Sequence, residues 1–91
     1  MFHGTIDLDA AKPVNDTAIP DALFERGLYW ASGRGGLVDL VAAHKWFNLA
    51  AARGVEAARN WRNQLAGEMA PAQVAEAQRL AREWLKIAPA S

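Results

Sequence analysis

Apolar residues recur at the spacing of α-helices in four segments of the chain. In the first segment, Leu23, Gly27 and Trp30 stand at positions i, i+4 and i+7 and form one apolar face. Pro20 suits the first turn of such a helix, because its missing N–H group costs nothing there. The pattern therefore predicts a helix over residues 20–32. A glycine in its middle lowers helix propensity by about 1 kcal/mol relative to alanine, and the close approach of a second helix is the expected compensation.

A glycine-rich turn, Gly33-Arg34-Gly35-Gly36, and a capping residue precede the second segment. The carboxylate of Asp39 can accept hydrogen bonds from the unpaired N–H groups of a first helical turn. Gly54 stands where a helix C-terminus is expected. These signals predict a helix over residues 40–53. Its apolar stripe consists of Leu40, Ala43, Phe47 and Ala50.

Two more helices are predicted over residues 55–66 and 71–87, and the second of them begins at Pro71. Their inner positions are Ala58, Trp61 and Leu65 in the first, and Val74, Ala77, Ala81 and Trp84 or Leu85 in the second. Each predicted helix carries one tryptophan on its apolar side, so we expect all four tryptophans, Trp30, Trp46, Trp61 and Trp84, in the core. Tyr29 lies one step off the apolar stripe and is the aromatic residue that we expect to be most exposed.

The same residues keep the register of a repeat motif. From Asp39 to Gly54 the chain follows the pattern D-x3-A-x2-W-[YF]-x2-A-A-x2-G, and the A-x4-G element from Ala22 to Gly27 precedes it. In this pattern the chain resembles the Sel1-like repeats, a branch of the tetratricopeptide-like helical-hairpin solenoids, over roughly residues 21–86. Two departures stand out, because Arg26 and Arg62 replace the leucine of the repeat. Arginine at these two positions predicts side chains that face water or a carboxylate.

The resemblance implies an all-α fold, in which two antiparallel helical hairpins stack as a short right-handed solenoid over residues 20–88. It also implies a non-enzymatic adaptor or scaffold of bacterial signalling, envelope or secretion-linked complexes. Solenoids of this kind bind a peptide or a partner helix on a concave face that the first helix of each hairpin lines. The residues expected on that face are Glu25, Tyr29, Ser32, Arg59, Asn60, Asn63 and Gln64.

The N-terminal residues 1–19 lack sustained periodicity and are predicted to be an extended or disordered arm. Residues 1–21 hold four aspartates against the single Lys12, whereas the whole chain has ten basic and ten acidic residues and no formal net charge. No signal-peptide pattern and no apolar run of about eighteen residues is present, which predicts a soluble, cytoplasmic protein.

Candidate chemistry is sparse. The sequence contains no cysteine, which excludes disulfides, thiolate nucleophiles and cysteine-ligated zinc. His44 has no His, Asp or Glu three or four residues away, so metal spacing is absent and a surface or hydrogen-bonded structural histidine is expected. The glycine-rich turn lacks G-x-G-x-x-G and G-K-[ST] and is read as a structural turn. We therefore expect no catalytic residue, cofactor or metal.

Three alternatives to an adaptor stay open at this point. Arg53, Arg59 and Arg62 could form a basic face for nucleic acid or another acidic partner. A short solenoid also exposes apolar ends, so the chain could build homo-oligomers. Hydrolase activity is attributed to some cysteine-rich Sel1-like proteins, but this chain has neither the cysteines nor an acid/base pair.

Overall fold

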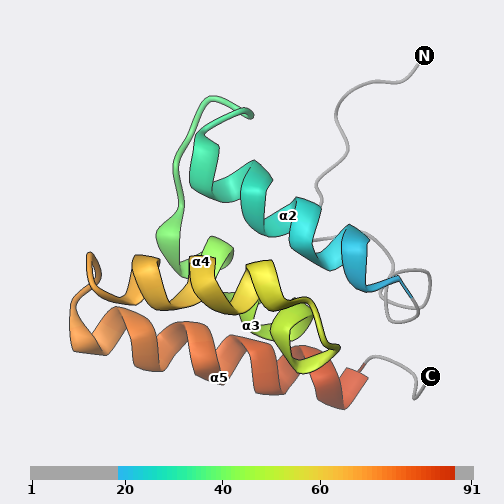
Figure 1. Cartoon of the computed structure of the whole chain (residues 1–91). Helices are drawn as coiled ribbons and strands as arrows, with labels where there is room; N and C mark the ends of the chain where they lie inside the picture. Colours follow the sequence, from blue (N-terminus) through green and yellow to red (C-terminus); the bar gives the residue numbers. More distant parts are fainter. Residues whose placement is uncertain (1–18, 88–91) are drawn as a thin grey trace.

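Four α-helices make up the regular structure of residues 19–87, the part of the chain that the computed structural model describes. They are α2 (Pro20–Ser32), α3 (Leu40–Ala52), α4 (Glu56–Ala66) and α5 (Pro71–Ile87), shown in Figure 1. The predicted all-α fold is confirmed for these residues, and each helix boundary lies within one residue of its predicted place. The arm predicted for residues 1–19 lies, apart from Ile19, outside the described residues.

The signals that predicted the helix ends act as expected. Asp39 is the N-cap of α3, where its Oδ1 accepts a hydrogen bond from the Ala42 N–H at 3.0 Å. Gly33 follows α2 in the left-handed conformation, with φ of 74°, which a residue with a Cβ adopts only with strain. After the turn the chain comes back beside the end of α2, where the Asp39 N–H donates a hydrogen bond to the Trp30 carbonyl at 3.1 Å. The glycine-rich segment is thus a structural turn.

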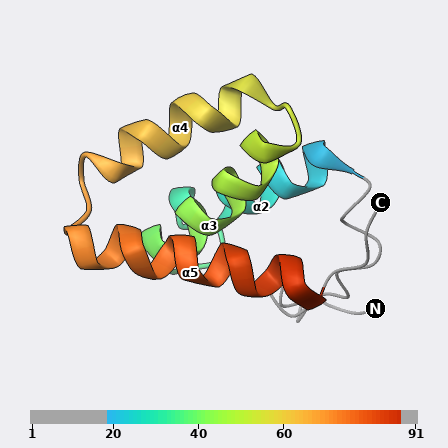
Figure 2. The same cartoon turned by 90° about the horizontal axis from the view of Figure 1, so that it is seen from below.

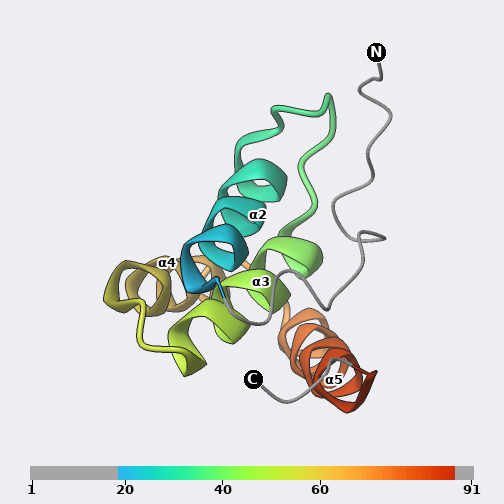
Figure 3. The same ribbon diagram turned by 90° about the vertical axis from the view of Figure 1, so that its right-hand side faces the viewer.

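Helix α3 is the central element of the fold. It makes extensive contacts with each of α2, α4 and α5, and no other pair among these four helices packs as extensively. Figures 2 and 3 show α3 between the other helices. The sequence of α3, LVAAHKWFNLAAA, explains this place, because a helix that is apolar on nearly all sides is stable only when it is covered on nearly all sides.

Two neighbouring aromatic residues of α3 connect it to its surroundings. The Phe47 ring lies 5.7 Å from the Phe24 ring of α2, and the Trp46 ring meets the Trp84 ring of α5 edge-on at 5.4 Å. Gly27 of α2 faces Phe47 so closely that a Cβ on this glycine would overlap the phenyl ring. The expected close approach at Gly27 is therefore confirmed. The fully buried core residues include Leu23, Ala43, Trp46, Phe47, Ala50, Ala58 and Ala77.

The prediction that all four tryptophans lie in the core is wrong in part. Trp46 and Trp84 are buried, but Trp30 is only half-buried and 40% of the Trp61 surface is exposed. Trp61 flanks the inner side of α4, which Ala58 and Leu65 occupy. It therefore covers the edge of the core without entering it.

The two arginines that replace the repeat leucine differ from each other. Arg26 does not face water: only 6% of it is exposed, and its guanidinium carbon lies 4.9 Å from the centre of the Trp46 ring. This cation–π geometry lets the charged group lie against the core. Arg62 is half-buried and donates to the Asn48 Oδ1 of α3 at 3.2 Å. Both arginines therefore join helices to α3.

Gly27→Ala tests whether the close contact at Gly27 decides how α2 packs. Alanine favours the helix itself by about 1 kcal/mol, but its methyl group would displace the Phe47 ring, and overpacking of this kind costs about 1–3 kcal/mol. We expect a net loss in the free energy of unfolding, measured by urea denaturation.

Gly67→Ala is the matched control, because Gly67 has a right-handed conformation and a Cβ there would meet only the Gln64 carbonyl oxygen at 3.4 Å. This control should be neutral or slightly stabilising. Equal or higher stability of Gly27→Ala relative to the wild type would show that the contact is unimportant.

Candidate functional site

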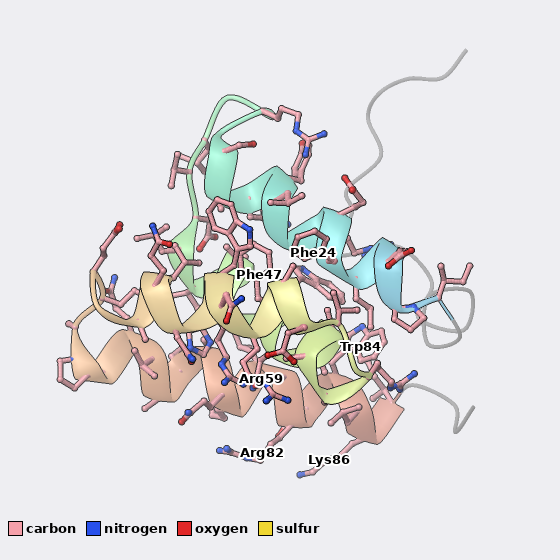
Figure 4. All side chains as sticks on the ribbon, in the orientation of Figure 1. Phe24, Phe47, Arg59, Arg82, Trp84 and Lys86 are labelled. Carbon is pink, nitrogen blue, oxygen red and sulfur yellow. The ribbon has the colours of Figure 1, made fainter. Side chains whose placement is uncertain are left out.

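Three aromatic rings in series join α2, α3 and α4. The Phe47 ring packs against Phe24 on one side and stacks on Trp61 at 5.8 Å, with 22° between the ring planes, on another. Figure 4 shows Phe24 and Phe47 between α2 and α4. Phe47 is buried, whereas Phe24 is half-buried and Trp61 is exposed. An apolar area that reaches solvent therefore lies where α2 and α4 flank α3.

We call this area the α2–α4 surface and define it by Phe24, Leu28 and Trp61. Leu28 follows Phe24 by four residues, so it lies on the same side of α2, and it is likewise half-buried. The Trp61 ring is held in place because one of its faces stacks on a buried ring. This contact restricts the orientations that the exposed tryptophan can adopt.

Polar residues one helical turn apart border the surface. On α2 these are the exposed carboxylates of Asp21 and Glu25, and Glu25 lies 3.9 Å from the exposed Arg34 guanidinium. On α4 they are the exposed amides Asn60 and Gln64. An apolar centre with a polar border is the usual composition of a protein-binding patch. Among the described residues, the charged side chains that border the α2–α4 surface are mainly acidic.

Of the seven residues expected on the concave face, Glu25, Asn60 and Gln64 are at this border. Tyr29 is five residues beyond Phe24, roughly 140° around the helix, and so lies on another side of α2. The Tyr29 hydroxyl packs against Gly35 of the turn. The Tyr29 ring contacts the Trp30 ring edge-on, with 5.1 Å between the ring centres. Tyr29 is half-buried, so the expectation that it is the most exposed aromatic residue is wrong.

The other three expected residues take part in local contacts. Ser32 Oγ donates to the Tyr29 carbonyl at 3.4 Å and accepts from the Arg34 N–H at 3.3 Å. Arg59 lies 4.0 Å from Glu56 on the exposed side of α4. Asn63 Oδ1 accepts two hydrogen bonds from the Arg62 guanidinium, at 3.2 and 3.1 Å. The structure therefore separates these residues from the aromatic series.

Sequence reasoning assigned Trp61 to the core and so missed it as a surface residue. One signal was present: Ala58 and Leu65, seven residues apart, define the inner side of α4, and Trp61 is roughly 50° away from it. The neighbouring Asn60 and Gln64 are polar, which fits an edge position. The sequence could not show that α3 leaves this edge of α4 uncovered.

His44 lies inside the protein, which corrects the expectation of a surface position. Only 2% of it is exposed, and its Nδ1 atom has no hydrogen-bond partner. Burial lowers the pKa of His44 below its ordinary value of 6.5, and the nearby positive charge of Arg62 lowers this pKa further. The imidazole is therefore neutral in the folded protein near pH 7.

Several kinds of site are absent from residues 19–87. No enclosed pocket is found there, and no group of three or more His, Cys, Asp or Glu side chains could hold a metal ion. None of the four helices is both long and apolar enough to cross a membrane. The α2–α4 surface is thus not part of an enclosed pocket.

Scans against protein-family models, curated proteins and solved structures returned no match to this chain. The Sel1-like resemblance therefore remains a prediction from its motif, and the case for function depends on the residues themselves.

The buried imidazole predicts how stability depends on pH. Since the pKa of His44 is lowered by folding, the unfolded chain binds more protons as the pH falls below about 6.5, and the free energy of unfolding decreases there. We expect urea denaturation to give a free energy of unfolding that decreases from pH 7 to pH 5. The slope of this decrease should be smaller in His44→Gln.

His3→Gln is the control, because His3 is the other of the two histidines in the sequence. If the slope comes from His44, this variant changes it less than His44→Gln does. A wild-type stability that does not change between pH 7 and pH 5 would contradict the account of His44.

Proposed function

We propose that this protein is a non-enzymatic interaction module that binds a peptide or a helix of another protein on its α2–α4 surface. The observation that carries the proposal is Trp61, a tryptophan with 40% of its surface exposed and with one ring face stacked on the buried Phe47. Tryptophan is the residue type most enriched among side chains that dominate binding energy. A fixed ring also loses little conformational entropy on binding.

The proposal includes the Sel1-like architecture, with α2 and α3 as one hairpin and α4 and α5 as the next. Support comes from the repeat positions: Gly27 of the motif faces Phe47 of the motif, and Asp39 caps the second helix. In such a stack the first helix of each hairpin lines the concave face, and here these helices are α2 and α4. The α2–α4 surface is where that face would be.

A role without catalysis, in the cytoplasm, is part of the same proposal. It is supported by a sequence without cysteine and without a nucleophile paired with a base. Binding of an acidic partner by the arginines of α4 has less support. Arg62 is engaged with Asn48 and Asn63, and Arg59 lies beside Glu56.

Trp61→Ala tests the proposal. The wild-type protein and the variant are used as baits in a lysate of the source organism, and recovered partners are quantified by mass spectrometry. Loss of a dominant side chain costs about 2 kcal/mol or more, so we expect recovery of the specific partner to fall by about 30-fold. A far-UV spectrum of the variant establishes that it folds.

Leu37→Ala is the matched control, because Leu37 is an exposed apolar residue of the turn between α2 and α3. It should leave recovery unchanged. The double variant Tyr29→Ala, Asn63→Ala examines the polar residues that the sequence favoured. If that variant loses the partner while Trp61→Ala keeps it, the α2–α4 surface is not the binding site.

A further inference from the structure

Exposed charges of opposite sign lie on one side of the first described helix and on one side of the last, although α5 also exposes Glu76 and Glu83. On α2, Asp21 and Glu25 are exposed, and the one arginine of this helix, Arg26, is buried against Trp46. On α5, Arg82 and Lys86 are exposed and lie one turn apart. Figure 4 shows both basic side chains extending from the same edge of α5. These two sides therefore present complementary charge.

Apolar side chains accompany the charges in both places. Leu85, with 47% of its surface exposed, follows Arg82 by three residues and so lies beside it on α5. On α2, Phe24 and Leu28 lie beside the carboxylates, and the buried Phe47 ring connects Phe24 to Trp61 on α4. Each patch thus combines apolar contact area with two charges of one sign, and each has one opposite charge nearby, Arg34 beside Glu25 and Glu83 beside Lys86.

Within residues 19–87, the charges in these patches are only weakly engaged. Neither Asp21 nor Arg82 forms an ion pair with another described residue. Glu25 is 3.9 Å from Arg34, and Lys86 is 3.5 Å from Glu83, with all four side chains more than half exposed. Exposed pairs of this kind contribute little stability, so they exchange readily for contacts with a second molecule.

We propose that the α2–α4 surface of one copy of this chain receives the Arg82–Leu85–Lys86 face of α5 from a second copy. This inference rests on the interaction role proposed above for the α2–α4 surface and names its partner. The observation that favours a second copy is the complementarity of the two patches, since each offers exposed apolar side chains beside charges that attract those of the other. Because the two patches differ, the contact joins copies head to tail.

Sedimentation velocity over a range of concentrations up to about 1 mM tests the proposal. A contact of one helix with two others is small compared with the roughly 1,200–2,000 Å² of a stable interface, so association is expected only in the upper part of this range. Arg82→Glu and Asp21→Lys should each weaken association about three- to tenfold, because each replaces an attraction by a repulsion.

The double variant Asp21→Lys, Arg82→Glu decides whether these two residues meet. It restores opposite charges in exchanged positions, so its association should return to within about twofold of the wild type. Glu68→Lys is the matched control, since Glu68 is an exposed acidic residue of the turn between α4 and α5 and makes no described ion pair. This control changes the net charge as Asp21→Lys does, but it should leave association unchanged.

The outcomes separate this inference from the proposed function. A wild type that stays monomeric throughout overturns the inference, and the partner recovery of Trp61→Ala still tests the function. If the wild type associates and Trp61→Ala weakens the association, but the single charge variants do not, the surface binds a second copy through some other face and α5 is not its partner. A double variant that remains as weak as the single ones also overturns the pairing.

Discussion

The packing of this protein depends on two adjacent side chains of one helix. Trp46 and Phe47 follow each other on α3, so they point to different sides of that helix, roughly 100° apart. Trp46 meets α5 through Trp84 and lies under the guanidinium of Arg26 from α2. Phe47 meets α2 through Phe24 and Gly27, and α4 through Trp61. Two residues thus join the central helix to all three of its neighbours.

Small residues make this arrangement possible. Two large rings fit around one helix only if the facing positions leave room, and Gly27 does so for Phe47. The remaining buried positions of α3 are largely alanines, which let its neighbours approach. The second pair of helices lacks this combination. At the offsets of the internal repeat, Asn63 corresponds to Gly27 and Ala81 corresponds to Phe47. This difference explains why α4 and α5 pack more extensively on α3 than on each other.

The sequence was sufficient to predict where the helices lie. It was not sufficient to predict which residues of each helix are covered by another helix. Helix ends follow from local chemistry, such as the ring of Pro20 or the carboxylate of Asp39, and these act over a few residues whatever the tertiary structure is. Periodicity also showed which side of each helix is apolar. It could not show how far a neighbouring helix covers that side. For this reason Trp61 was expected in the core, and Arg26 and His44 were expected to contact water or polar groups.

Arg26 illustrates why such residues are hard to place. An arginine in a repeat position that is usually leucine indicates exposure, because burying a charge is costly. Here the flat guanidinium lies over an aromatic ring, which supplies an apolar contact and an electrostatic attraction together. That solution requires Trp46, a residue on a different helix, and a pattern read along one helix cannot reveal it.

The burial of Arg26 also changes the charge that the protein presents to its surroundings. The chain has no formal net charge, so it has no large long-range field of one sign. At short range the position of each charge matters more than the sum. Because the arginine of α2 is covered, the exposed side of that helix carries its two carboxylates, whereas α5 keeps its basic residues in solvent. Within residues 19–87, packing of the core thus decides which charges reach solvent: the two carboxylates of α2 do so without their neighbouring arginine, and on α5 Arg82 and Lys86 do so together with Glu76 and Glu83.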